Sequence, residues 1–401
     1  MNFQKNKFSY FFLIISSFLL FYSFYRSEIY WEGEKRLYYH SYYIISLILI
    51  FFSIITFFLS PILKKYLMIS IFSLVFSLYL FEGYLTIKKK KPNISQALKE
   101  SIYKNNTGKN WDKRTRLQIY KELQMLNNNI SLTVSPTLNI KNNSEFFPLS
   151  GISNIKTIHC NENGYYSIYS SDRYGFNNPD KEWDKKEIEY FLVGDSYLHG
   201  GCVNRPNDIA SNLRRLSNKS ALNLGYDGNG PLIQLATLRE FLKGEVKKVL
   251  WIYYSRNDLK DLHYEKTNKL LLEYIDNPNF SQNLLLNQNK VDKILSKQIS
   301  KTTGLVRNSP KFNFLSFIKL YNLRDFKLKN KDLASLTEFK EIITLAKELS
   351  NKNNTQLYFI YLPGYESFSL KKEDKNYKSI KNLINELNIP FIDIYKEILK
   401  T

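Results

Sequence analysis

The chain has 401 residues, 44% of them hydrophobic and 15% aromatic, with only two cysteines. This length can bury the core of one large domain or two smaller ones, and the composition excludes a disulfide-stapled mini-protein and a collagen-like or low-complexity chain. The formal charge is +20, but the lysines are spread along the chain and no basic helix or RNA-binding aromatic motif stands out, so we expect no nucleic-acid partner.

Three long apolar segments occupy the N-terminal region, at 8–25, 42–63 and 66–87, and the only charged residue within them is Glu82. Each is close to the ~20 residues that a helix needs to cross ~30 Å of hydrocarbon. Core helices seldom run this long without a polar face, and no small-residue cleavage site follows the first segment. We therefore predict a transmembrane anchor of three helices within residues 1–91, with two helices as the alternative.

The charges around these segments leave the topology open. Lys5, Lys7 and the lysines at 64–65 favour a cytoplasmic N-terminus. The basic residues at 26–36 and the lysines at 88–91 would then lie outside, which the positive-inside rule disfavours. The tally of charges alone favours the opposite orientation.

A mixed segment follows, which we predict to be a juxtamembrane α+β region at 92–186. Apolar spacing predicts helices at 93–105 and 111–127, and short strands are predicted at 130–134 and 165–170. The stretch between the two strands is polar and rich in asparagine, which is typical of a connector, and residues 172–179 form a turn-rich loop.

From residue 187 to residue 401 the pattern alternates between strands and helices. The predicted strands are 190–193, 221–224, 249–254, 356–361 and 391–394. The predicted helices are 208–216, 232–242, 336–349 and 377–387, with an insertion at about 259–331 that carries a helix at 291–301. Alternating units of this kind predict an α/β fold with a flavodoxin-like, doubly wound parallel sheet, whose site lies at the carboxyl ends of the strands.

Three loops that follow successive predicted strands carry residues suited to acyl transfer. In the first, at 194–200, Ser196 comes directly after a strand and Gly-Asp, so its hydroxyl and its N–H can both meet a substrate carbonyl. The second, at 223–230, is rich in glycine, which lets a substrate approach the backbone and offers an N–H. In the third, at 255–258, the amide of Asn257 can donate to the same oxyanion.

This succession resembles the SGNH hydrolases, also called the GDSL-like family, over about residues 187–401. The Gly-Asp-Ser sequence ending at Ser196, Gly228 five residues after an asparagine, and Asn257-Asp258 match three of the family's blocks, although Ser255 and Arg256 replace its usual glycines. The resemblance implies that Ser196 is the nucleophile and that the Ser196 N–H, the Gly228 N–H and the Asn257 side chain form an oxyanion hole. Asp195 and Asp258 would be supporting residues. Residues 172–179 also resemble a segment that precedes this motif in membrane-anchored bacterial members.

The fourth block of the family, Asp-x-x-His after the last strand, is not found. Asp393 ends the predicted last strand, but Lys396 stands where the histidine would be. Of the four histidines at 40, 159, 199 and 263, His199 is nearest to Ser196 in sequence and is a weak candidate for the base. We expect that the sequence ends before this block. The alternatives for the other residues are a helix N-cap at Ser196 and a turn residue at Asn257.

These features predict a membrane-anchored serine ester hydrolase or O-acyltransferase acting on acyl or acetyl esters of cell-envelope glycans. The alternative is a catalytically inactive glycan-binding or envelope-assembly protein with the same fold. We expect no cofactor and no metal, since no His/Cys/Asp cluster has ligand spacing. The sequence leaves open the acyl acceptor and the oligomeric state.

The two cysteines, Cys160 and Cys202, flank the predicted serine loop. We predict one disulfide between them, against the alternative of two buried thiols. A disulfide requires an oxidising compartment. This favours a soluble domain outside the cytoplasm, on an anchor in the bacterial inner membrane.

Overall fold

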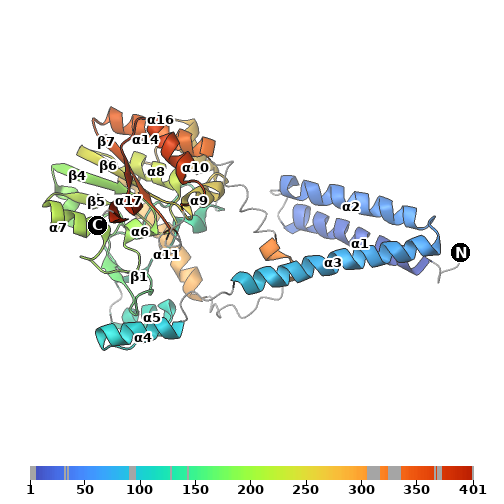
Figure 1. The fold of residues 1–401 in the computed structure, drawn as a ribbon. Coiled ribbons are helices and arrows are strands. Elements are labelled where there is room, and N and C mark those ends of the chain that lie inside the picture. The colour runs from blue at the N-terminus through green and yellow to red at the C-terminus, as the bar shows by residue number, and fades with distance from the viewer. Residues whose placement is uncertain are drawn as a thin grey trace. The chain divides into compact units, whose positions relative to one another are not determined.

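The structure is a computed structural model and describes residues 6–30, 33, 36–89, 96–126, 129–141, 144–304, 317–323, 336–364, 367 and 373–399. The chain divides into two compact units (Figure 1). The first consists of Met1–Lys91 and Phe312–Phe326, and the second of Pro92–Lys311 and Lys327–Thr401. Residues 92–186 thus belong to the same compact unit as the predicted α/β region.

The first unit contains three helices that are long and apolar enough to cross a membrane, one for each of the three apolar segments of the sequence. Helix α1 (Lys7–Phe24) continues as a π-helical segment at Tyr25–Tyr30, and is followed by α2 (Arg36–Thr56) and α3 (Pro61–Lys89). Most of their large apolar side chains face outward; Phe72, for example, is 69% exposed. Surfaces of this composition are suited to lipid rather than water.

The break between the second and third helices lies earlier than the sequence pattern indicated. We predicted a second span ending at 63 and a third beginning at 66, whereas α2 ends at Thr56 and α3 begins at Pro61. Proline suits the first position of a helix because its missing N–H would have no partner there. Ser60 supports this start, since its Oγ accepts the N–H of Leu63 at 3.4 Å.

The second unit opens with two helices and a small sheet. These elements are α4 (Gln96–Thr107), α5 (Arg116–Leu126), β1 (Ile130–Leu132), β2 (Lys156–Ile158) and β3 (Ile168–Ser170). Strand β2 is central, parallel to β1 and antiparallel to β3. It lies in the stretch that we predicted to be a connector. We missed this strand because three residues are too few to show an alternating pattern.

The main sheet has five strands, all parallel, as the alternating pattern predicted (Figure 1). In chain order they are β4 (Glu187–Val193), β5 (Ala221–Asn223), β6 (Glu245–Tyr254), β7 (Gln356–Leu362) and β8 (Phe391–Asp393). Their spatial order is β5-β4-β6-β7-β8. Counted from β4, this order is 2-1-3-4-5, the order of flavodoxin-like sheets, and it reverses direction between β4 and β6.

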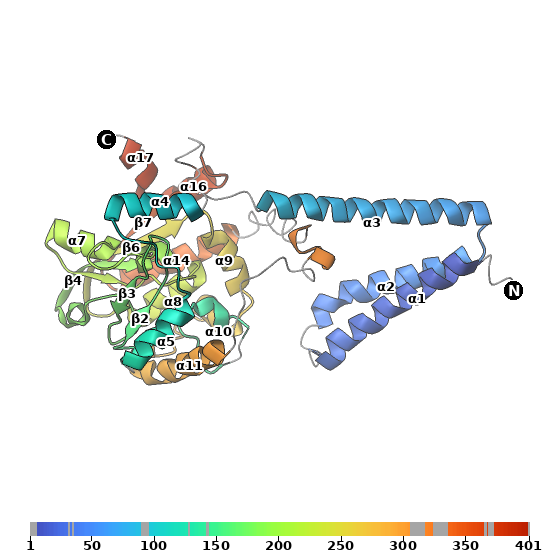
Figure 2. The same ribbon diagram turned by 90° about the horizontal axis from the view of Figure 1, so that it is seen from below.

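Helices cover both faces of this sheet (Figure 2). They are α6 (Ser196–His199), α7 (Ile209–Ser217), α8 (Pro231–Phe241), α9 (Asp258–Glu265), α10 (Lys269–Asp276), α11 (Leu284–Gly304), α14 (Leu336–Lys352), α16 (Tyr377–Glu386) and α17 (Ile394–Leu399). Apolar residues of α8, α14 and α16 share the larger core, and Leu198 and Leu213 on α6 and α7 pack on the other face. Helix α8 is buried almost all round, because α9, α10 and α11 cover the side that faces away from the sheet.

Candidate functional site

Ser196 lies at the carboxyl end of β4 as the first residue of helix α6. Asp195 is the N-cap of this helix, and its Oδ1 accepts the N–H of Tyr197 at 2.9 Å. Gly200 ends the helix with a φ of +112°, a conformation that favours glycine. The Ser196 side chain is half-buried. In the part of the chain that the structure describes, the Ser196 N–H has no recorded acceptor, so this N–H is available to a substrate carbonyl.

Asn257 follows β6, the strand that lies beside β4 in the sheet. Burial raises the pKa of Asp195. The side chains of Asn257 and Ser196 both lie close enough to the Asp195 carboxylate to lower its pKa, and so oppose part of this effect. The Asn257 Nδ2 also donates to Asp261 Oδ2 at 2.8 Å. Two of the three predicted blocks therefore meet at Asp195, where the strand order of the sheet reverses and where open α/β sheets bind ligands.

Gly228 lies in the loop after β5, the second of the three predicted blocks. Its φ is +82°, which favours glycine, and a β-carbon there would collide with the Oγ of Ser135 unless that side chain moved. Among the described residues no acceptor is recorded for its N–H. The neighbouring Asp227 raises the pKa of Asp195, which indicates that this loop faces the same carboxylate.

Five carboxyl groups gather at this edge of the sheet, on Asp195, Asp227, Asp258, Asp261 and Glu265. Burial is the main cause that raises the pKa of each, to about 6 for Asp261 and to about 8 for Glu265. We predicted Asp195 and Asp258 from the sequence and missed the other three. The spacing of 258, 261 and 265 was the available signal, since residues at i, i+3 and i+7 share one face of a helix.

Several buried polar atoms here make no well-formed hydrogen bond within the described residues. They are Asp195 Oδ2, Asp258 Oδ1, Asn257 Oδ1, Gln234 Oε1 and both polar atoms of the Asn229 side chain. Most buried polar groups in proteins are paired, and leaving one unpaired costs about 1–3 kcal/mol. A concentration of such atoms at one edge of the sheet is typical of a site that pairs them with a ligand.

The two histidines nearest in space to the serine loop lie in a buried aromatic cluster. His199 Nε2 is 2.9 Å from the Tyr169 hydroxyl. The His199 ring stacks on that of Tyr226 and lies tilted against that of His159, with centroids 4.3 Å apart. Burial lowers the pKa of His199 well below its usual value and that of His159 to about 4. Both rings are therefore neutral at pH 7. No contact between either ring and Ser196 is recorded, so the structure does not place His199 where a base for Ser196 would be.

The predicted disulfide between Cys160 and Cys202 is present, with a Cα–Cα distance of 5.0 Å. It joins the turn between β2 and β3 to the chain just after α6. The loop at 172–179 adds a second support, because Asn178 and Asn223 exchange two hydrogen bonds of 2.8 Å and Asn177 Nδ2 donates to the His199 carbonyl at 2.9 Å. The juxtamembrane segment thus fixes the loops that carry Ser196 and Gly228.

The residue that follows Ser196 in the chain belongs to an aromatic pair. The Tyr197 and Tyr254 rings lie 4.3 Å apart, and their hydroxyls are 3.2 Å apart. Tyr197 is 44% exposed. A partly exposed ring next to Ser196 gives a substrate an apolar face with a hydroxyl at its edge.

The loops after β7 and β8 contain further acidic residues but no histidine among the described ones. Asp393 ends β8 as predicted, and its Oδ2 accepts the Tyr377 hydroxyl at 2.5 Å. Asp374 accepts hydrogen bonds from Ser255 and Tyr361, and thereby ties the Asn257 loop to the chain after β7. A small cavity of 40 Å³ lies between Asp374 and Asp393.

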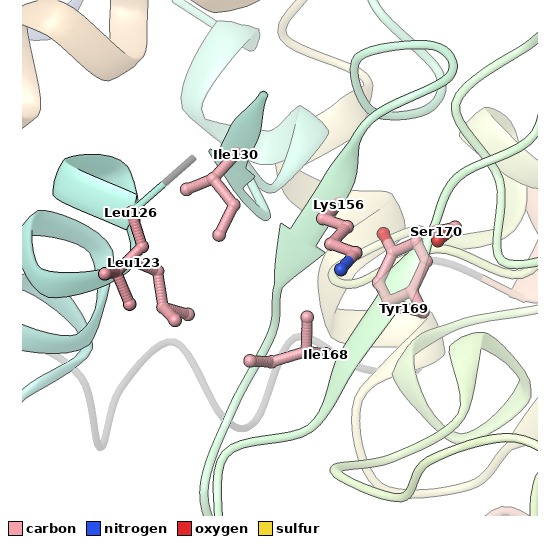
Figure 3. A pocket seen from close by; sticks show the side chains of 7 residues that line it. All are labelled: Leu123, Leu126, Ile130, Lys156, Ile168, Tyr169 and Ser170. Atoms are coloured by element: carbon pink, nitrogen blue, oxygen red, sulfur yellow. The ribbon is translucent and has the colours of Figure 1, made fainter. Parts of the chain in front are cut away.

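A larger cavity of 390 Å³ lies away from Ser196, between α5 and the small sheet (Figure 3). Figure 3 shows Leu123 and Leu126 of α5 on one side and residues of the strands on the other, with Lys156 as the charged group in the lining. No residue of the serine loop lines it.

Glu265 links the candidate site to stability. Its carboxylate accepts the N–H groups of Gly230 and Leu232 at 2.6 and 2.9 Å. Burial raises its pKa from 4.5 to about 8, so its contribution to stability is complete below pH 4.5 and is lost as the pH rises through about 8. We expect Glu265→Gln to flatten the pH dependence of the unfolding free energy in this range by up to about 1.4 kcal/mol per pH unit.

This prediction is checked by urea unfolding of the full chain in detergent at several pH values, followed by tryptophan fluorescence. Glu273→Gln is the matched control, because Glu273 is exposed on the neighbouring helix α10. Equal slopes for the Glu265→Gln variant and the original chain would show that Glu265 is ionised in the folded state throughout this range.

Within the described residues no group of three or more histidine, cysteine, aspartate or glutamate side chains is arranged to hold a metal ion. No protein-family model matches the chain, and no curated protein matches it.

Proposed function

We propose that the chain is a membrane-anchored serine ester hydrolase or O-acyltransferase of the SGNH type, acting on acyl or acetyl esters of cell-envelope glycans. The observation that carries this proposal is the meeting of Ser196 and Asn257 at Asp195, on the two strands between which the sheet order reverses. The resemblance of the three loops to that family adds to it. The disulfide supports an oxidising compartment and hence a domain outside the cytoplasm.

In the proposed reaction the Ser196 hydroxyl oxygen attacks the ester carbonyl, and the alcohol leaves as the carbonyl re-forms. The negative charge that develops on the carbonyl oxygen is held by the N–H groups of Ser196 and Gly228 and by the Asn257 amide. The acyl group, now esterified to Ser196, passes to water in a hydrolase or to a sugar hydroxyl in a transferase. Tyr197, the exposed ring beside the nucleophile, is suited to contact the sugar.

The reaction also needs a group that takes the Ser196 proton and passes it to the oxygen of the leaving alcohol. Asp195 is the titratable group beside the hydroxyl, and none of the four histidines contacts Ser196 within the described residues. This observation favours the second candidate function, an inactive protein that binds glycan esters or takes part in envelope assembly. Two results together would favour that second function. Ser196→Ala would still bind glycan esters, and the original chain would form no acyl-enzyme.

Asn257→Ala tests the oxyanion hole. Losing one such donor typically costs about 10²- to 10³-fold in kcat, with a smaller effect on KM, because the donor acts on charge that develops in the transition state. We expect this loss in hydrolysis of an activated acetyl ester by the full chain. Lys260→Ala, at an exposed position on the same helix, should leave the rate unchanged. An unchanged kcat in Asn257→Ala would remove Asn257 from the proposed site.

A further inference from the structure

Glu82 is a carboxylate inside the third apolar helix, and it is fully buried. Ionisable groups in membrane spans are rare and nearly always have a defined partner. Here the partner comes from a segment more than 200 residues away in sequence, at 317–323, which belongs to the same compact unit as the membrane helices. Figures 1 and 2 both show this short orange segment beside α3.

The contacts between them involve both oxygens of the carboxylate. Glu82 Oε1 accepts the backbone N–H and the side-chain amide of Asn322, both at 2.9 Å, and Oε2 accepts the N–H of Leu323 at 2.8 Å. The Asn322 amide also donates to Thr86 Oγ1 at 2.9 Å. Every oxygen of the buried carboxylate is thus paired with the segment.

An aromatic contact extends this interface by one helical turn. The Tyr79 hydroxyl donates to the Ile318 carbonyl at 2.9 Å, and the Tyr79 and Phe317 rings lie 5.6 Å apart. Tyr79, Glu82 and Thr86 are spaced i, i+3 and i+7, so they form one face of α3. The contact therefore covers about two turns of the helix.

The position of this face along α3 indicates its depth. Glu82 lies 21 residues after Pro61, and at 1.5 Å per residue this is roughly 30 Å, the thickness of the hydrocarbon core. The face therefore lies near one boundary of the bilayer, not at its centre. There, Ile318 and Tyr321 of the docked segment point outward and are 45% and 57% exposed.

We propose that residues 317–323 are a second, non-spanning membrane attachment. The segment docks on the face of α3 formed by Tyr79, Glu82 and Thr86, and it presents Ile318 and Tyr321 to the lipids at the membrane boundary. A bilayer is the partner that fits, because these side chains continue the lipid-facing surface of α3, on which Tyr84 and Ile87 are also exposed. Residues 317–323 are thereby held at the membrane, whatever chemistry Ser196 performs.

Photocrosslinking of the full chain in nanodiscs of phosphatidylethanolamine and phosphatidylglycerol tests this proposal. p-Benzoyl-phenylalanine at position 318 should form lipid adducts, as it should at the lipid-facing position 72, whereas at position 317 it should crosslink to a peptide of α3. Both products are identified by mass spectrometry. The proposal would be overturned if the probe at position 318 labelled no lipid while the probe at position 72 did. It would also be overturned if the probe at position 317 labelled no α3 peptide.

The role of the carboxylate is tested by a pair of variants on α3. Glu82→Ala should abolish the crosslink from position 317 to α3, because the N–H groups of Asn322 and Leu323 lose their acceptor. Ser77→Ala is the matched control and should retain it, since the Ser77 hydroxyl bonds only to the carbonyl one turn earlier in its own helix. Equal crosslinking in both variants would show that Glu82 does not hold the segment.

Discussion

Replacing Ser196 with alanine is expected to abolish nearly all ester hydrolysis by the full chain, leaving only the residual rate that oxyanion stabilisation supports. The substitution removes the atom that would form the bond to the acyl group, and leaves the N–H groups and the amide around it in place. In enzymes where a general base takes the proton of the nucleophilic serine, replacing that serine lowers kcat on the order of 10⁶-fold. The measurement is the initial rate of acetate release from an activated acetyl ester, before and after the substitution.

Ser217→Ala is the matched control, because Ser217 ends helix α7, where its hydroxyl donates to the carbonyl of Leu213 and accepts the N–H of Lys219. Added imidazole sharpens the comparison, since it supplies a proton acceptor in solution. It should accelerate hydrolysis by the original chain beyond its effect on Ser196→Ala. Equal rates of hydrolysis by the original chain and by Ser196→Ala, with and without imidazole, would show that Ser196 is not the nucleophile.

Replacing both cysteines with serine is expected to lower the free energy of unfolding of the second unit by about 4 kcal/mol. The disulfide closes a loop with a sequence separation of 42 residues, and the chain-entropy estimate for a loop of this size is about 4 kcal/mol. Because Cys202 closely follows α6, we also expect the variant to lose part of any Ser196-dependent activity. Urea unfolding of the full chain in detergent, followed by tryptophan fluorescence, measures the first effect.

Reduction provides the control for the disulfide. A thiol reductant should destabilise the original chain to the level of the double variant and should not change the variant further. If the original chain unfolds at the same urea concentration with and without reductant, and the reductant is shown by thiol titration to have acted, the disulfide does not stabilise the fold.

Much of the second unit could be predicted from local sequence. The strands β4, β6 and β7 are apolar runs long enough to stand out, and Asp195, Ser196 and Asn257 follow directly after two of them. The order of the strands then brings the residues together, because the carboxyl ends of parallel strands share one edge. The break before α3 was misplaced, since apolar residues continue across it and the proline alone marks the new helix.

Other features depend on contacts between distant parts of the chain. The docking of Asn322 on Glu82 joins residues 240 positions apart, and no local pattern at either site indicates it. The positive φ and the contact with Ser135 that favour glycine at 228 likewise come from packing against an earlier segment. The raised pKa values of Asp261 and Glu265 arise from burial, which helical spacing alone does not reveal.

Labelling of the original chain with a fluorophosphonate ester, followed by digestion and mass spectrometry, tests the proposed function most directly. The reagent phosphonylates an activated serine and does not depend on knowing the acyl substrate. We predict one adduct, on Ser196, that is lost when the reagent is added to Ser196→Ala and is unaffected in Ser217→Ala. An adduct on another serine, or no adduct on Ser196 under conditions that label an authentic serine hydrolase in the same tube, would contradict the assignment of Ser196 as the nucleophile.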